Sequence, residues 1–433
     1  MPAARLMKRR DNEMAEDRLY DLAFAFKNTK LWEKLSDLDL FAVRLPGGDI
    51  GYCCVMGQMG DHLALAVYVG DEGFQSYRRL ASADMRTLRP VAMYNMMASQ
   101  CCIQCSLENR EDMTDEEVKE IRAYAKAHQI TVRGKHAYPQ FSRHTAGRLP
   151  WQIRSKEDEE RLCEGLLAAL EVHRRLLEGT KEEMGLSKMN EKTAVIPLLS
   201  REGENWRLET TPVPTKESTV PEVEFTDQLL SARLKKKKKK GIWECAACWL
   251  MTPVQEDETD EEAPFYPLAL MAANLESGMV LMPVISDGSD LSEMVHQFAQ
   301  SMQECGSVPK TIRCGEERSF SMLRDLCEKT GIAMEKTDEL EVLDDALMSL
   351  LDHMREMDED EDEDDDDDFD DDEGLVDPMG HFEDLANAID EVTDAELRQM
   401  PREVKDMLRE FADMDVLPEE TARRIRRVLG RKR

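Results

Sequence analysis

The sequence predicts an α+β N-terminal domain followed by an α/β domain with a mixed sheet. Two observations predict this fold class. At 433 residues the chain is too long for one ordinary core, and 41% of its residues are hydrophobic, enough for globular domains. Short β-rich runs dominate the first half, whereas strand patterns alternate with helix patterns in the second. We therefore expect domains at residues 12–212 and 242–355, joined by a Pro/Lys-rich linker at 213–241.

The N-terminal domain opens with a helix and continues as a β-meander. Apolar side chains recur at helical spacing over residues 12–35. The runs FAVRL, GYCCVMG and LALAVYV, separated by turn residues, predict three strands, and QCCIQCSLENR predicts a further strand. Thr114 and Glu117 form a capping box for a helix that ends near His128. A helix at 155–178 and a hairpin of AVIPLLS with NWRLETTPVP complete the domain.

The second domain alternates strands with helices, a pattern typical of a largely buried sheet. The predicted strands cover residues 268–273, 279–285, 309–314 and 331–335. The predicted helices cover residues 290–305, 317–330 and 342–355.

Charge is concentrated near the end of the chain. Sixteen acidic residues lie between Glu356 and Glu373, about half of the formal net charge of -33. Such a run cannot bury itself, so we expect a low-complexity, disordered acidic linker at 356–378. A small helical appendix at 379–429 and a basic tail at 430–433 follow it.

Several features predict a cytoplasmic protein that does not act at a membrane. Eleven cysteines without a regular spacing predict reduced thiols. The amino terminus reaches Asp11 and Glu13 before any apolar core, unlike a secretory signal. The longest apolar stretch is interrupted at Asn274 and Glu276, which predicts two strands around a turn rather than a membrane span.

Two CxxC pairs, Cys102 with Cys105 and Cys245 with Cys248, invite a metal or redox interpretation. Pairs that share one zinc ion are usually about 15–20 residues apart. Here Cys105 and Cys245 are 140 positions apart, and both pairs lie in strand-like sequence, where alternate residues face opposite ways. We expect no metal and no cofactor. The chain also lacks GxSxG, HExxH, P-loop and GxGxxG motifs, so a binding protein is expected rather than an enzyme.

Residues 133–151, RGKHAYPQFSRHTAGRLPW, form the candidate binding site. Four Lys/Arg, two His and three aromatic residues lie there without a carboxylate. We expect a loop between two helices that recognises an anionic group on a protein or a nucleic acid. The alternative is that the cations pair with neighbouring carboxylates while the rings fill the core. The candidate ligand-binding residues are Arg133, Lys135, His136, Tyr138, Arg143, Arg148 and Trp151.

Most of residues 12–355 resemble an uncharacterised bacterial family that pairs two domains of unknown function. The first domain carries this resemblance in DLDLFAVRLPGGDIGYCCVMG and CIQCSLENREDMTDEEVKEIRAYAKAHQITVRGKHAYPQF, and the second in PLALMAANLESGMVLMPVI and GSVPKTIRCGEERSFSMLRDLCEKTGI. The resemblance implies no activity. It implies that the CSLENR strand and the RGKHAYPQF loop belong to the recurring pattern of the family.

The order of elements in residues 265–336 is also similar in topology to the RNase H-like cores of integrases. Their chemistry needs carboxylates on the first strand and near a later strand end to hold two metal ions. The first strand here, LALMAAN, has no acid, and Cys314 stands where an aspartate is expected. Asp287, Asp290 and Glu293 remain available to a metal-dependent phosphodiesterase, but they are also placed to cap the following helix.

Two further alternatives involve charged segments. The run Lys235–Lys240 either holds nucleic acid or an acidic partner, or is a solvated spacer. The acidic run could instead fold back onto these lysines or onto the Arg-rich tail, competing with an external polyanion. A dimerising scaffold that self-associates through its C-terminal helices is a third possible role for the protein.

Overall fold

The computed structural model describes residues 18–60, 62–83, 87–190, 192–203, 205–215, 222–255, 263–337, 339–362, 405 and 419–429. They belong to two compact units, Met1–Glu356 and Met357–Arg433. The acidic linker beyond residue 362, the basic tail and most of the expected helical appendix lie outside the described residues. Within the appendix, α13 (Glu419–Leu429) is described. No helix in the described residues is long and apolar enough to cross a membrane.

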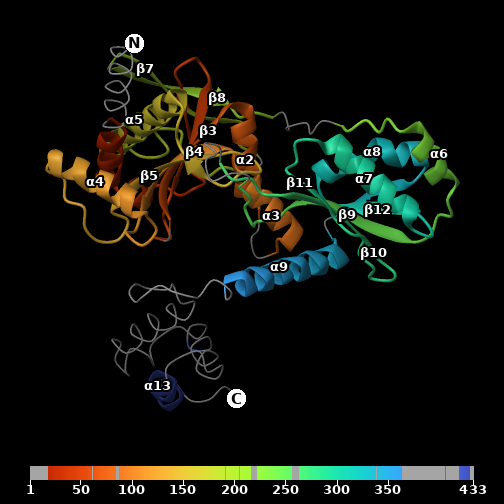
Figure 1. Ribbon diagram of the computed structural model, residues 1–433. Helices are drawn as coiled ribbons and strands as arrows, with labels where there is room; N and C mark the ends of the chain where they lie inside the picture. Colours follow the sequence, from red (N-terminus) through yellow and green to blue (C-terminus); the bar gives the residue numbers. More distant parts are fainter. Residues whose placement is uncertain are drawn as a thin grey trace, which may run out of the picture. The chain divides into compact units, whose positions relative to one another are not determined.

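The N-terminal domain contains an eight-stranded sheet in the order β6-β5-β4-β3-β2-β1-β7-β8 (Figure 1). Neighbouring strands pair antiparallel except β1 and β7, which are parallel. The predicted β-meander is therefore confirmed. The strands are β1 (Phe41–Arg44), β2 (Ile50–Met56), β3 (Leu63–Val69), β4 (Cys102–Glu108), β5 (Tyr138–His144), β6 (Trp151–Gln152), β7 (Val195–Glu202) and β8 (Asn205–Pro212).

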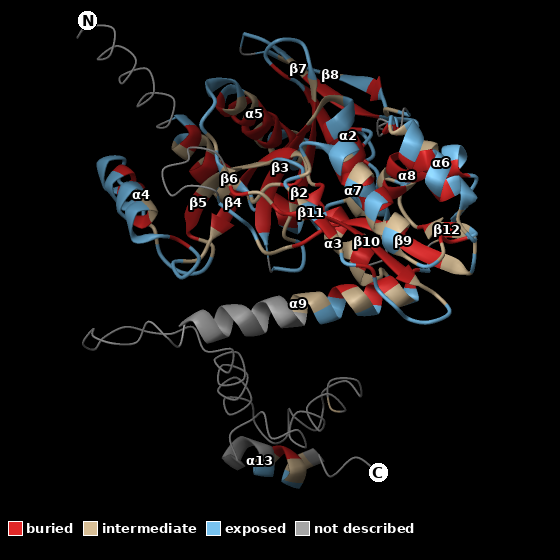
Figure 2. Cartoon of the chain, turned by 45° about the vertical axis from the view of Figure 1, so that its right-hand side comes forward, coloured by how far each residue is buried: buried red, intermediate tan, exposed pale blue. Residues whose placement is uncertain are grey.

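Helices cover both faces of this sheet. Strand β3 alternates its side chains, so Val67 packs in one core with Leu166 of α5 (Lys156–Glu178), while Tyr68 packs in another with Phe74 of α2 (Gly70–Ser82). The helical residues 18–29 add Phe26 to the α5 side. The short helix η1 (Leu31–Glu33) follows them. Both faces of the central strands are buried, as the red ribbon in Figure 2 shows.

Residues 133–151 differ from the expected loop. Residues 138–144 form β5 and Trp151 begins β6, two antiparallel strands at the edge of the sheet, joined by a turn. Strand β5 pairs with β4 along its whole length, from Glu108 opposite Tyr138 to Cys102 opposite His144. The strand covers backbone groups of β4 that would otherwise be unpaired. Pro139 and the polar residues conceal this long-range pairing in the sequence.

The second domain is an α/β domain with a five-stranded mixed sheet in the order β11-β10-β9-β12-β13. Strand β9 pairs antiparallel with β10 and parallel with β12, so it separates the two halves of the sheet. Strand β9 comes before the four predicted strands in the chain and was not among them. Strand β11 is shorter than the strand predicted at 279–285. The strands are β9 (Ile242–Trp249), β10 (Leu268–Asn274), β11 (Val284–Ser286), β12 (Thr311–Cys314) and β13 (Ala333–Lys336).

One face of the second sheet packs against α6 (Gln228–Lys236), α7 (Leu291–Glu304) and α8 (Glu317–Thr330), which lie together in Figure 1. Composition predicts a linker where α6 lies. The structure instead buries Phe225, Leu230 and Leu234 in the core of the second domain. The helical pattern of apolar residues covers fewer than three turns here, and the surrounding prolines and lysines made the segment resemble a linker.

The other face of the second sheet packs against α9 (Glu341–Asp362) and α3 (Pro90–Ala98). Helix α3 belongs to the N-terminal part of the chain, yet Val91 shares a core with Ala246 and Leu343 of the second domain. The remaining helix, α4 (Asp115–Ala127), begins with the predicted capping box of Thr114 and Glu117.

Candidate functional site

The predicted site residues occupy separate parts of the molecule. Arg133 and Lys135 are exposed in the turn before β5. His136 is half-buried in the left-handed region, with a φ of 51°. Its backbone N–H donates to Asn109 Oδ1 at 2.9 Å, and its ring Nδ1 lies 3.1 Å from the Leu107 carbonyl oxygen. His136 therefore anchors the turn.

Two other predicted residues have internal partners. Tyr138 is buried, and its hydroxyl accepts a hydrogen bond of 3.0 Å from Nη2 of Arg122. Arg143 Nη1 lies 2.8 Å from Oδ1 of Asp158, at the start of α5. These two residues agree with the structural alternative for residues 133–151, in which the cations pair with carboxylates and the rings fill the core.

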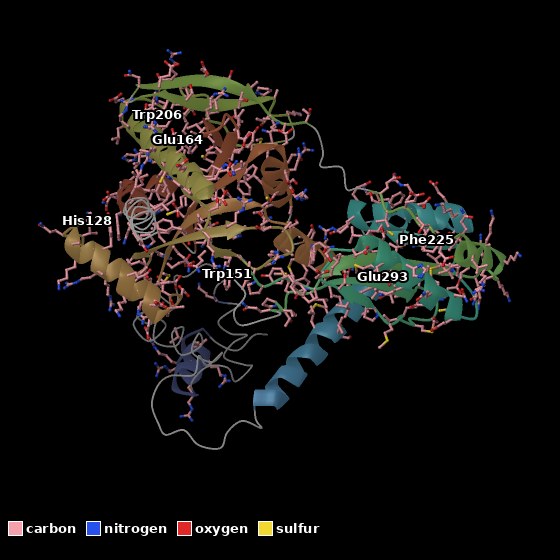
Figure 3. All side chains as sticks on the ribbon, turned by 45° about the horizontal axis from the view of Figure 1, so that its top comes forward. His128, Trp151, Glu164, Trp206, Phe225 and Glu293 are labelled. Atoms are coloured by element: carbon pink, nitrogen blue, oxygen red, sulfur yellow. The ribbon has the colours of Figure 1, made fainter. Side chains whose placement is uncertain are left out.

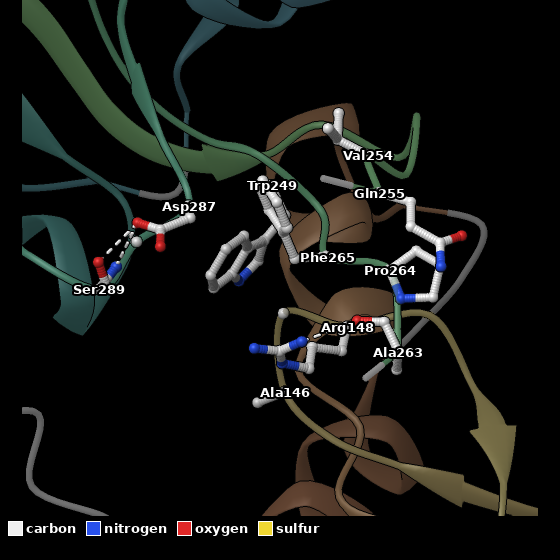
Figure 4. Close-up of a pocket in the computed structure, with 12 residues that line it drawn as sticks. Ala146, Arg148, Trp249, Val254, Gln255, Ala263, Pro264, Phe265, Asp287 and Ser289 are labelled. Carbon is white, nitrogen blue, oxygen red and sulfur yellow. Dashed lines mark hydrogen bonds between the residues drawn. The ribbon is translucent and has the colours of Figure 1, made fainter. Parts of the chain in front are cut away.

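Arg148 lines a cavity of about 440 Å³ where the turn after β5 meets the second domain (Figure 4). Its Nη1 donates to the Ala263 carbonyl at 2.7 Å. Asp287 also lines this cavity and accepts hydrogen bonds from the backbone and hydroxyl of Ser289, at 2.9 and 2.7 Å. These bonds, followed by the nearby Arg148 charge, hold the pKa of Asp287 below its usual value. The lining of this cavity therefore carries both signs of charge.

A larger cavity, of about 900 Å³, lies between the helical residues 18–29, α4 and strands β4 to β6. We call it the aromatic cavity. Figure 3 labels His128 and Trp151, which contribute two of its rings. The ring-bearing lining residues are Tyr20, Tyr124, His128, Phe141, His144 and Trp151. The acidic lining residues are Glu108, Glu117, Glu120 and Glu159.

Ring contacts hold one wall of the aromatic cavity in place. The Tyr20 ring centroid lies 4.9 Å from that of Tyr124 and 5.3 Å from that of Phe141. Tyr124 stacks on His128 at 4.2 Å with an interplanar angle of 18°. The Tyr124 hydroxyl donates to Oδ1 of Asp21 at 2.5 Å. This wall is thus ordered before any ligand enters, which lowers the entropy cost of binding.

The lining of the aromatic cavity has a negative balance of charge. Among the described residues it contains four glutamates and no Lys or Arg. Glu117 also caps α4 and accepts a hydrogen bond of 3.2 Å from Gln140. Burial lowers the pKa of His144 to about 4, so this ring is neutral at pH 7 and adds no positive charge to the lining.

Of the predicted site residues, the aromatic cavity contains Trp151 alone. Sequence reasoning missed the contribution of α4, although a signal was present. Glu120, Tyr124 and His128 are four positions apart and so share one helix face. Nothing local indicated that this face would lie opposite β5.

The CxxC pairs are divided between different cores, as their spacing predicts. Cys102 and Cys105 belong to cores on opposite faces of the first sheet, and Cys245 and Cys248 to cores on opposite faces of the second. Burial raises the pKa of each of these thiols. The described residues contain no group of three or more His, Cys, Asp or Glu arranged to hold a metal ion.

The acids considered for phosphodiester cleavage have local roles in the structure. Asp290 caps α7 by accepting from the Glu293 backbone N–H at 2.9 Å, as the alternative reading of the sequence predicts. Strand β9 adds an acid that the sequence analysis did not consider, Glu244. Its Oε2 accepts from the backbone N–H groups of Val342 and Leu343 at 3.0 and 3.1 Å, at the start of α9.

Comparisons with known proteins identify two domains. Residues 17–195 match a family model described as a domain of unknown function (DUF7309). Residues 230–351 match a second one, also a domain of unknown function (DUF6930). No curated protein and no solved structure matched the chain, and likeness to RNase H-like cores is not shown. The chain is therefore a two-domain protein that joins a DUF7309 domain to a DUF6930 domain.

Proposed function

We propose that this is a non-enzymatic binding protein whose N-terminal domain takes a cationic group of its ligand into the aromatic cavity. The observation that carries this proposal is the lining: six rings and four glutamates, with no Lys or Arg among the described residues. Aromatic faces attract ammonium and guanidinium groups, and carboxylates at the same site add to that attraction. The volume of about 900 Å³ is in the range of ligand-binding cavities.

This ligand charge is opposite to the one that the composition of residues 133–151 predicts. Two of the four cations in that stretch are directed elsewhere, Arg143 to Asp158 and Arg148 to the Ala263 carbonyl. The rings of Phe141 and Trp151 line the aromatic cavity without them. The local charge at the rings is therefore supplied by α4, β4 and α5 rather than by the stretch itself.

A matched pair of ligands and a matched pair of variants test the proposal. Calorimetric titration should detect binding of argininamide and little binding of citrullinamide, both with the α-amino group acetylated, so that the first carries one positive charge and the second, of nearly the same shape, carries none. Changing Glu108 and Glu120 together to Gln should weaken argininamide binding roughly tenfold, about 1.4 kcal/mol. The control variant changes Glu111 and Glu116 to Gln, which are exposed and outside the cavity lining, with the same change in net charge.

Equal affinity for the two ligands, or an equal loss in both variants, would refute the cationic ligand. In the first case the cavity would select shape alone. In the second the effect would come from the overall charge of the protein.

A second candidate is the anion recognition predicted for residues 133–151. Its support is the exposure of Arg133 and Lys135 in the turn anchored by His136. Changing Arg133 and Lys135 to Ala should leave the fold intact and abolish recovery of the protein on immobilised polyphosphate, since both side chains are exposed. Unchanged recovery would leave the turn with a structural role only.

A further inference from the structure

Two of the six consecutive lysines at the start of the second domain hold the ends of helices. Lys237 Nζ donates to the carbonyl of Cys305, the C-cap residue that follows α7. Lys239 Nζ donates to the carbonyls of Thr330, at 2.9 Å, and Gly331, where α8 ends. Ammonium groups at helix C-termini satisfy unpaired carbonyls and interact favourably with the helix dipole. The run is therefore built into the fold and is not a free spacer.

Backbone hydrogen bonds keep the segment extended between these anchors. The Val308 N–H donates to the Lys238 carbonyl at 3.0 Å, and the Lys240 N–H donates to the Val308 carbonyl at 2.8 Å. The Lys310 N–H donates to the Gly241 carbonyl at 2.9 Å. In an extended segment alternate side chains point in opposite directions. Lys237 and Lys239 accordingly point inward and are half-buried, whereas Lys238 and Lys240 are exposed.

Further exposed cations lie close to Lys238 and Lys240 along the chain or in the fold. They belong to α6 and to the residue before β12. In the part of the chain that the structure describes, none of them takes part in an ion pair or a side-chain hydrogen bond. Figure 2 shows the exposed residues of α6 in pale blue. We call this group the basic surface, and its members are Arg233, Lys235, Lys236, Lys238, Lys240 and Lys310.

We propose that the basic surface binds the phosphate backbone of duplex nucleic acid without reading the bases. Five of its six members are lysines, which contact phosphates as point charges. No aromatic residue that could stack on a base lies between Arg233 and Lys240, which argues against a single-stranded ligand. A duplex presents one phosphate charge per ~1.7 Å of its axis, a regular anion dense enough to contact several ammonium groups at once. This surface belongs to the second domain and is independent of the aromatic cavity.

The rest of the protein shapes how such binding behaves. With a formal net charge of -33, the chain as a whole repels a polyanion, so only a local cation cluster can hold one. Binding must then be driven by counterion release and must weaken steeply as salt concentration rises.

The test measures fluorescence anisotropy of a labelled short duplex of mixed sequence with the full-length protein, between about 50 and 200 mM salt. One variant changes Lys236, Lys238 and Lys240 to Gln. Its matched control changes three exposed lysines of the N-terminal domain to Gln, with the same change in net charge. The control positions are Lys119, Lys126 and Lys156.

We expect the first variant to lose at least tenfold in affinity and the control less than twofold. The slope of log affinity against log salt should become shallower by about 0.9 for each lost phosphate contact. Circular dichroism should show both variants folded, since every changed side chain is exposed.

Three results would overturn the proposal. The full-length protein could fail to bind the duplex at the lowest salt, or the two variants could lose equal affinity. Polyglutamate could also compete as well as unlabelled duplex at equal charge, in which case the surface would recognise an acidic protein instead.

Discussion

Glu316 is a half-buried residue at the junction between α3 and the second domain. It precedes α8 and accepts a hydrogen bond of 2.7 Å from the side-chain amide of Asn95. Burial raises its pKa from the ordinary value of 4.5 to about 7, although the Asn95 bond and neighbouring arginines act in the other direction. The folded protein therefore binds a proton here that the unfolded chain has already released near pH 6.

This difference in pKa predicts a stability change with a definite sign. The stabilisation that the protonated group provides is fully present below about pH 4.5 and is lost as pH rises through about 7. Glu316→Gln, which resembles the protonated form, should therefore raise the free energy of unfolding by about 3 kcal/mol at pH 8 relative to the wild type. Near pH 4 the two proteins should be almost equal. Urea denaturation at both pH values measures this, and a pH-independent difference would contradict the raised pKa.

At the scale of single elements, the helix caps of the lysine run give a second prediction. Lys239→Gln should lower the free energy of unfolding by about 1 kcal/mol, because the carbonyls at the end of α8 lose their ammonium partner. Lys238→Gln, the exposed neighbour, should leave stability nearly unchanged. Thermal unfolding of the two variants compares them directly. Equal destabilisation would mean that Lys239 does not act as a cap.

Elements with strong local signals could be predicted from the sequence. Helix α8 begins and ends at the predicted residues 317 and 330, where Gly331 adopts the left-handed conformation that ends many helices. Helix α4 has the predicted capping box. Strand β5 and helix α6 were missed because their stability depends on partners far away in the sequence. Strand β5 is stabilised by pairing with the edge of β4, and α6 by the core that it shares with α7 and α8.

The candidate site was predictable only in part, for the same reason. Composition pointed to the region of Phe141 and Trp151, which does line the aromatic cavity. The charge around those rings depends on which cations of the stretch line the cavity. Arg143 does not line it and instead pairs with Asp158, which lies beside it in the fold. Tyr20 and Tyr124 meet in that wall although about a hundred residues separate them.

At the scale of the whole first unit, Asn95 connects the two domains. Its side-chain amide donates to the Ala247 carbonyl at 2.8 Å, and its oxygen accepts from the Trp249 N–H at 3.0 Å. The side chain of Asn95 thus makes the backbone hydrogen bonds at the end of β9 that a neighbouring strand would otherwise make. The backbone of Arg148 adds a bridge to Phe265 nearby.

The buried position of Asn95 predicts that its loss weakens the whole unit. Asn95→Ala leaves a buried carbonyl and a buried N–H without partners, which should lower the free energy of unfolding by roughly 3 kcal/mol. Hydrogen exchange at the Trp249 amide should accelerate accordingly. Met97→Ala, on the exposed side of the same helix, should have little effect on either quantity. Unchanged exchange at Trp249 in the Asn95 variant would show that the domains hold together without this residue.

The parallel pairing of β1 with β7 has a consequence for biosynthesis. Ala42 lies opposite Leu198, so one edge of an internal strand has no partner until the ribosome has added more than 150 further residues. At typical translation speeds of about 5–20 residues per second, that interval is roughly ten to thirty seconds. Throughout it the nascent chain presents an unpaired apolar strand edge, the kind of surface that promotes aggregation before a fold is complete.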